Sequence, residues 1–188
     1  WKFLWAPLLD RYAFPGLGRR RGWMLFTQSG LLLLVGCMGF LSPTGDLSLI
    51  VYAATGVALL SATLDIALDA YRRELLSDGE LGLGNAVHVN AYRIAGLVPG
   101  SLSLILADHL PWTTVFLVTA GFIVPGIVLA LVVAEPTAAS APRSLREAVA
   151  EPFREFWHRR GWSEALLVLA FIFFYKLGDS MCTALATP

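Results

Sequence analysis

The sequence is short of charge. Lys, Arg, Asp and Glu together make up 15% of its 188 residues, whereas a typical soluble domain carries about 25%. Apolar residues make up 56%, so a surface facing water would be thinly charged and the bilayer is the expected solvent. The formal net charge is zero. Without a basic excess, the chain gives no sign of a nucleic-acid partner.

Catalytic and metal-binding patterns are also lacking. Cys37 and Cys182 lie in apolar runs without a C-x-x-C neighbour, which favours small core residues over redox groups or metal ligands. The three histidines, His88, His109 and His158, share no ligand spacing. No Ser-His-Asp or G-x-S-x-G pattern is found. We therefore expect no enzyme, no bound metal and no cofactor.

Long apolar runs dominate the sequence. Five segments are candidate membrane spans: residues 23–41, 47–64, 86–107, 110–134 and 162–185. About 20 residues of helix cross the roughly 30 Å hydrocarbon core of a bilayer. Because backbone groups in lipid must be paired within the segment, all five are predicted to be helices. Residues 1–9 resemble the end of a sixth span, so we interpret the chain as an internal piece of a larger protein.

The basic residues of the connections alternate along the chain. Segments 10–22, 72–84 and 135–161 contain four, two and five Lys or Arg, and the two short connections between them contain none. The positive-inside rule places these three segments on the cytoplasmic side. The third also has a capping-box spacing at Ser144–Glu147, followed by apolar residues at helical spacing. This pattern predicts an amphipathic helix on the membrane surface, or more simply a linker between two helical bundles.

Two acidic residues interrupt the end of the second complete span. Asp65 and Asp69 are four residues apart, which places both on one face of a helix. Charges within a span usually face a bundle interior or an aqueous cavity, where two carboxylates can relay protons or hold a cation. The alternative is that both lie at the membrane interface and are neutralised by Arg72 and Arg73.

Further polar residues lie within the other spans. Arg93, with Asn90 and Tyr92 nearby, lies eight residues into its span and needs a carboxylate, a water-filled cavity or an anionic ligand. The alternative is that Arg93 extends to the interface. Lys176 and Asp179 are three residues apart and are predicted to share a helix face, where they can pair or respond to a substrate. The alternative for Lys176 is the far membrane interface.

The segment Gly96–Gly100 combines two small residues four apart with a proline. Close packing against another helix is the simpler interpretation. A hinge used in conformational change is the alternative.

Several motifs together resemble one family. Residues Ala6–Arg11, followed by Gly18–Arg21, resemble the signature G-x-x-x-D-R-x-G-R-R of major facilitator superfamily transporters, although Ala6 replaces the first Gly and residues 12–17 are inserted. The chain is most similar in these and other motifs to the AmpG muropeptide permease family. The other motifs are Asp65–Ala70, Tyr92–Arg93, Glu135–Thr137 and Tyr175–Asp179.

The resemblance implies an all-α polytopic membrane protein, an incomplete major facilitator bundle from late helix 2 to helix 7. Residues 1–134 would belong to the N-terminal six-helix half. Residues 135–161 would form the cytoplasmic loop between the halves, with its amphipathic helix, and residues 162–188 the first helix of the C-terminal half.

The resemblance also implies a function. Members of this family lie in the inner membrane of Gram-negative bacteria and import 1,6-anhydro-muropeptides, GlcNAc-anhydro-MurNAc with or without the peptide, from periplasm to cytoplasm. Uptake would use the proton gradient, without a cofactor or a metal. It would feed peptidoglycan recycling and supply the signal for β-lactamase induction. The full-length protein is expected to be a monomer in the bilayer, with no nucleic-acid partner.

Site residues follow from this resemblance. Arg93 and Lys176 would hold anionic groups of the cargo, and Asp65, Asp69 or Asp179 would carry the proton. Asn90 and Tyr92 complete the expected substrate-binding or proton-coupling set. The expected cytoplasmic gate motif consists of Asp10, Arg11, Gly18, Arg19 and Arg20. Two alternatives stay open: a related transporter of another anionic cargo such as acetyl-CoA, and a membrane scaffold or receptor that transports nothing.

Overall fold

The computed structural model describes residues 5–136, 161, 163–164, 166–178 and 181. The chain divides into two compact units, Trp1–Ala141 and Pro142–Pro188, which are treated separately below. The described residues are helical apart from turns and one isolated bridge, between Phe14 and Gly18. The predicted amphipathic helix within 135–161 lies outside the described residues.

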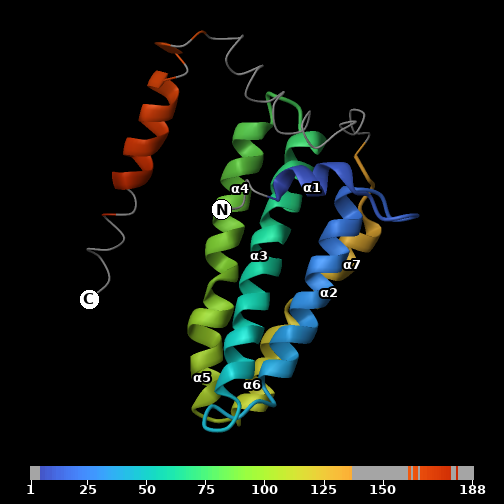
Figure 1. The fold of residues 1–188 in the computed structure, drawn as a ribbon, viewed down its shortest axis with the longest axis vertical. Helices are drawn as coiled ribbons and strands as arrows, with labels where there is room; N and C mark the ends of the chain where they lie inside the picture. The colour runs from blue at the N-terminus through green and yellow to red at the C-terminus, as the bar shows by residue number, and fades with distance from the viewer. Residues whose placement is uncertain (1–4, 137–160, 162, 165, 179–180, 182–188) are drawn as a thin grey trace. The chain divides into compact units, whose positions relative to one another are not determined.

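The first unit is a bundle of helices (Figure 1). Its elements are α1 (Ala6–Arg11), α2 (Arg20–Met38), α3 (Leu47–Leu75), α4 (Leu81–Ala95), the π-helical turn η2 (Val98–Leu102), α5 (Ser103–Ala107), α6 (Trp112–Gly121) and α7 (Val124–Val132). The long helix α2 contacts α3, α6 and α7. The short helix α1 lies at the end of the bundle where α2 begins and α3 ends (Figure 1).

Three helical stretches in the described part of the chain are long and apolar enough to cross a membrane, judged by length and composition: Leu47–Leu75, Leu81–Ala107 and Trp112–Val132. They match three of the five predicted spans. Helix α2 overlaps a fourth, although it begins and ends three residues earlier and the polar residues 27–29 make it less apolar. In the second unit a shorter apolar helix, Leu166–Gly178, covers most of the described part of the fifth.

The second complete span ends later than the uncharged run in the sequence suggests. Helix α3 continues past Leu64 to Leu75. The charged residues that end the apolar run do not end the helix, because Arg and Glu are good helix formers. The run of uncharged residues therefore marks the part of α3 suited to lipid, and the last turns of the same helix carry its charged residues.

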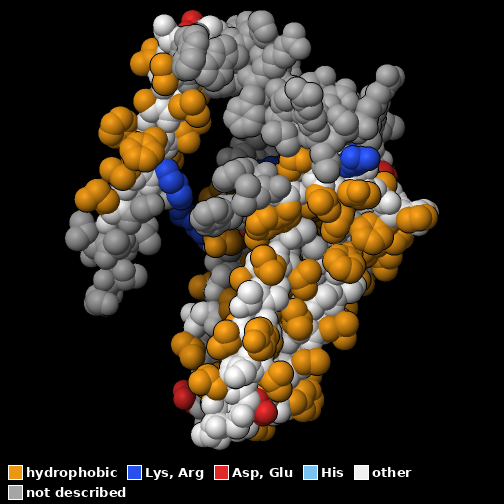
Figure 2. Space-filling model, in the orientation of Figure 1, with side chains coloured by type: hydrophobic (Ala, Val, Ile, Leu, Met, Phe, Trp, Pro, Cys, Tyr) orange, Lys and Arg blue, Asp and Glu red, His pale blue; other side chains and the backbone are white. Residues whose placement is uncertain are grey.

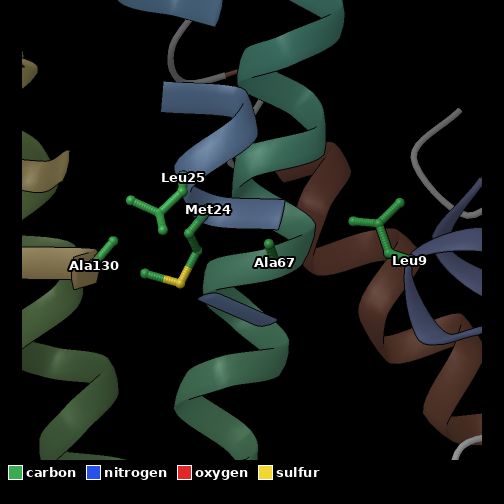
Figure 3. Packing of buried hydrophobic residues seen from close by; sticks show 5 residues of the cluster. All are labelled: Leu9, Met24, Leu25, Ala67 and Ala130. Carbon is green, nitrogen blue, oxygen red and sulfur yellow. The ribbon is translucent and has the colours of Figure 1, made fainter. Parts of the chain in front are cut away.

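Small residues allow the helices to pack closely at the end that carries α1. Five buried side chains from α1, α2, α3 and α7 meet there (Figure 3): Leu9, Met24, Leu25, Ala67 and Ala130. Ala67 and Ala130 are 0% exposed. Van der Waals contact between close backbones is the main force that joins helices in a bilayer, since lipid is as apolar as the side chains. This packing fixes the ends of the helices on which a charged cluster is built.

The visible surface of the helices is largely hydrophobic, as expected for a protein surrounded by lipid or by further helices (Figure 2). Val132, for example, is 78% exposed. Cys37, expected in the core, is exposed, because α2 turns this face away from α3, α6 and α7. Cys182 lies outside the described residues.

The third long helix is interrupted at the segment predicted either to pack closely or to act as a hinge. Pro99 lies in η2, where the helix widens to a π-helical turn, because proline has no N–H to donate and its ring clashes with the preceding turn. The Ser103 hydroxyl donates to the Val98 carbonyl and lies 2.9 Å from the Thr119 hydroxyl of α6. A Cβ built on Gly100 would meet nothing within 4 Å, so the expected close packing is not made within the described residues.

Candidate functional site

Basic residues at the start of α2 meet acidic residues from two other helices. Nη2 of Arg19 and Nε of Arg20 donate to the same carboxylate oxygen of Glu74, at the end of α3, at 3.1 and 3.0 Å. Nη1 of Arg20 lies 2.8 Å from Oδ1 of Asp10 on α1. The Arg20 side chain is only 6% exposed. Ion pairs therefore hold the ends of α1, α2 and α3 together.

Arg20 keeps its charge in this position. Burial by itself lowers the pKa of the Arg20 guanidinium, but the hydrogen bonds and charges of Glu74 and Asp10 outweigh this effect and leave the pKa above its ordinary value. The cluster therefore contains a cation at every accessible pH, and its strength depends on the two carboxylates.

A second set of contacts joins the start of α2 to the end of α7. The carboxylate of Glu135 accepts the backbone N–H of Arg20 at 2.7 Å and that of Arg21 at 3.0 Å. These N–H groups have no partner within the helix, and a negative charge is favourable at this end. In return, the Arg21 side chain donates to the carbonyls of Ala130 and Leu131 at the end of α7, at 3.1 and 2.6 Å. Each helix end therefore receives its missing hydrogen bonds from the other.

Gly18 occupies a place that no other residue fits easily. Its φ is +84°, in the left-handed region that disfavours a side chain. A Cβ here would lie 2.5 Å from the carboxyl carbon of Glu135. Glycine thus allows the turn before α2 and leaves room for the carboxylate that caps it.

The structure brings together four of the five residues predicted for the gate motif: Asp10, Gly18, Arg19 and Arg20. Arg11 is the exception. It makes no ion pair with the described residues, and its guanidinium lies 5.8 Å from the ring centre of Tyr12. Sequence analysis assigned no role to Glu74 or Glu135. For Glu135 the signal was the motif Glu135–Thr137, whereas Glu74 had none.

A second polar region lies in the groove between α3 and α4. A cavity of about 260 Å³ is lined by Asp65, Asp69, His88, Val89 and Tyr92. The two aspartates are one turn apart on α3, and the imidazole and the phenol are one turn apart on α4. The groove thus places two acidic groups opposite two groups that donate or accept hydrogen bonds.

One of the two aspartates has a basic neighbour. Nη2 of Arg72 lies 2.9 Å from Oδ1 of Asp69, one turn along α3. Arg72 also borders a larger, mainly apolar cavity of about 460 Å³ further along the groove, and His88 lines both cavities. Of the two arginines expected to neutralise the aspartates, Arg72 pairs with Asp69, whereas Arg73 pairs with Asp78.

The other predicted site residues lie elsewhere. The side-chain amide of Asn90 donates to the Ala86 carbonyl of its own helix at 2.8 Å, and Arg93 lies in the last turn of α4. Neither lines the cavity that contains Tyr92. Lys176 belongs to the helix Leu166–Gly178 of the second unit. Asp179 lies outside the described residues, so its predicted pairing with Lys176 stays a prediction.

Sequence analysis missed His88. Its position four residues before Tyr92 is the available signal, but a lone histidine without ligand spacing does not by itself indicate a site. Asp65 and Asp69, which line the same cavity as His88, belong to α3, so local spacing in α4 cannot reveal them. Within the residues that the structure describes, no group of three or more His, Cys, Asp or Glu is placed to hold a metal ion.

Comparison with known proteins gives relatives over nearly the whole chain. A protein of Haemophilus influenzae described as uncharacterized is 50% identical over 99% of this chain and 44% of its own length. The anhydromuropeptide permease of Escherichia coli K12 is 42% identical over 99% of this chain and 38% of its own length. A putative transporter, AmpG 4, of Rickettsia felis is 28% identical over the whole chain and 47% of its own length.

The chain therefore spans less than half the length of these relatives. The predicted likeness to AmpG permeases and the predicted all-helical fold are confirmed, and the relatives described by function are transporters rather than enzymes. The sequence profile of the Major Facilitator Superfamily matches residues 2–185. The chain is thus part of an integral membrane protein and belongs to the Major Facilitator Superfamily.

Proposed function

We propose that the complete protein is a secondary active permease that imports anhydromuropeptides across the bacterial inner membrane, driven by the proton gradient. The cargo is suggested by the 42% identity to the E. coli anhydromuropeptide permease. The observation that carries the transport mechanism is the cavity between α3 and α4, where two carboxylates follow the apolar part of a helix long enough to cross a membrane.

In this proposal Asp65 carries the proton. It lies ten residues before the end of α3, about 15 Å along the helix axis. Asp65 comes directly after the uncharged run, which ends at Leu64, so it lies at the edge of the part of α3 suited to lipid. An ionised group there costs less free energy than the roughly 2.5–3.5 kcal/mol found at the centre of a span. Binding a proton neutralises the carboxylate and removes this cost during the transport cycle. Asp69 lies one turn nearer the loop and has Arg72 as its partner, so its assigned role is to shape the cavity.

The cargo is assigned to basic and polar groups of the spans. Muropeptides contain peptide carboxylates, and Arg93 and Lys176 are the cations that the proposal assigns to them. The Tyr92 phenol lines the cavity and is assigned a hydrogen bond to the cargo. Asn90 is kept in the substrate-binding set as a neighbour of Tyr92, and Asp179 as a second candidate for the proton.

The charged cluster at the start of α2 is assigned to the gate. Transporters of this class rock two helical halves around a site near the membrane midplane. A cluster that joins the ends of α1, α2, α3 and α7 makes these helices move as one body. The proposal places residues 10–22, 72–84 and 135–161 in the cytoplasm, as their basic residues predict, and treats the full-length protein as a monomer without cofactor.

The test measures uptake of radiolabelled anhydromuropeptide by proteoliposomes that contain the full-length protein. With an inward proton gradient, we expect wild-type protein to accumulate the cargo. Asp65→Asn should abolish accumulation and retain entry down a cargo gradient, because the neutral amide mimics the protonated acid but releases no proton. Asp108→Asn, in the connection after α5, is the control and should accumulate cargo normally.

Absence of any muropeptide entry in the wild-type protein would refute the cargo. Normal accumulation by Asp65→Asn, with unchanged dependence on pH, would refute the role of this residue. Normal accumulation with unchanged pH dependence in Asp179→Asn would likewise exclude Asp179 as the second candidate for the proton carrier.

A further inference from the structure

His88 is an ionisable group in the α3–α4 cavity to which neither the sequence motifs nor the proposed mechanism assigns a role. It lies seven residues after the start of α4, about 10 Å along the helix axis. No Lys, Arg, Asp or Glu lies between Leu81 and His88. The imidazole is therefore separated from the connecting loop by about two turns of uncharged helix.

Other titratable and charged residues face His88 through the two cavities that it lines. Helix α3 contributes Asp65, Asp69, Tyr71 and Arg72, the turn before α4 contributes Glu80, and α4 itself contributes Tyr92. Among these groups, Asp69 has Arg72 at 2.9 Å, and Glu80 accepts from the Ser77 hydroxyl at 2.6 Å.

Imidazole is the one side-chain type in this set whose ordinary pKa lies between pH 5 and 8. When it binds a proton, the cavity gains one positive charge, whatever charge it had before. The five residues that line the smaller cavity are exposed, so the groove is open on one side. The apolar helices that form its walls still make a unit charge act more strongly there than in bulk water. Such a change alters the relative affinity of the cavity for anions and cations.

We propose that His88 is a charge switch of this cavity: the protonated imidazole favours entry of anionic cargo, and the neutral imidazole disfavours it. The switch itself is a property of the cavity, whereas its effect on muropeptides rests on the proposed function. His88 thus becomes a residue that sets specificity for the charge of the cargo, distinct from the carboxylate that couples transport to the proton gradient.

The first experiment measures the charge of the cavity without transport. In the full-length protein, with Cys37, Cys182 and any further cysteines replaced by serine, Val89→Cys places a thiol on the cavity wall. Its reaction rates with an anionic and a cationic methanethiosulfonate reagent are measured from pH 8 to pH 5.5. The ratio of the two rates cancels the ionisation of the thiol itself.

With His88 present, we expect the ratio of anionic to cationic rates to rise about tenfold as the pH falls, since a unit charge a few ångströms away changes each rate about threefold in opposite directions. His88→Gln should abolish most of this rise. His88→Lys should give a high ratio at every pH, which shows that a loss in the glutamine variant is not simply misfolding. An equal rise in wild type and His88→Gln would overturn the proposal.

The second experiment measures exchange of labelled muropeptide across proteoliposomes with the same pH on both sides, so that no proton gradient drives the flux. We expect exchange to fall as the pH rises through the range in which imidazole titrates, and His88→Gln to flatten this profile. His109→Gln, in the connection between α5 and α6, is the matched control and should keep the wild-type profile. If wild type exchanges muropeptide and His88→Gln has the same pH profile, the switch alone is overturned. If wild type shows no exchange, the muropeptide cargo is refuted, and the ratio of reagent rates in the first experiment decides on the switch.

Discussion

The cluster at the start of α2 makes a quantitative prediction about Glu74. Replacing it with glutamine removes the carboxylate shared by Arg19 and Arg20 and leaves Asp10 as the acidic partner of Arg20. The Arg20 side chain is 6% exposed and that of Glu74 is 22% exposed, so the pair is largely removed from water. Breaking a fully buried ion pair costs about 3–5 kcal/mol.

We expect Glu74→Gln to cost about 2–3 kcal/mol, below the value for full burial, because Glu74 is partly exposed and the glutamine oxygen still accepts a hydrogen bond. The matched control is Asp78→Asn. Asp78 pairs with Arg73 at 2.8 Å, but its side chain is 86% exposed, and such exposed pairs contribute little.

The measurement is thermal unfolding of the full-length protein in detergent, followed by tryptophan fluorescence. Glu74→Gln should lower the Tm by several degrees, and Asp78→Asn should leave it within error. Equal Tm values for wild type and Glu74→Gln would refute the view that the cluster is a buried lock. Equal losses in the two variants would show that burial does not distinguish the pairs.

Two further predictions concern the turns that flank these helices. Gly18→Ala should lower the Tm more than Gly16→Ala, because both glycines have positive φ but only at Gly18 does a Cβ collide with Glu135; comparable losses would show that backbone strain alone matters. The pKa of Glu80 lies below its ordinary value because it accepts hydrogen bonds from the hydroxyl and the N–H of Ser77. The stability this contributes is present above the unfolded pKa and is lost as the pH falls through the folded pKa. Ser77→Ala should raise the carboxyl titration midpoint in a carbon-13 NMR titration, and an unchanged midpoint would contradict the assignment.

The apolar runs predicted the helices well because burial in lipid imposes one backbone structure. Their ends were harder to predict. The uncharged run stops at Leu64, yet α3 continues to Leu75, since hydropathy reports the solvent around a helix and hydrogen bonding decides where the helix stops. The π-helical turn at Pro99 was not predicted. For the segment 96–100 the sequence left close packing and a hinge as alternatives, because the choice between them depends on what the neighbouring helix presents.

The candidate sites were predicted in part for a similar reason. Asp65 and Asp69 share a face because helical spacing is local. The partners of Arg20, by contrast, are separated from it by 54 and 115 residues at Glu74 and Glu135, and no local pattern reports such distances. The orientation of the loops and the roles of Arg93, Lys176 and Asp179 stay predictions.

The exchange of caps between α2 and α7 has a mechanical consequence. Glu135 is held in place by hydrogen bonds from the backbone N–H groups of Arg20 and Arg21. Any chain after Pro136 therefore starts from an anchored position. Tension applied to that continuation is delivered to the first turn of α2 as well as to the last turn of α7. A force on this part of the chain is therefore borne jointly by the first turn of α2 and the last turn of α7, which are more than a hundred residues apart in the sequence.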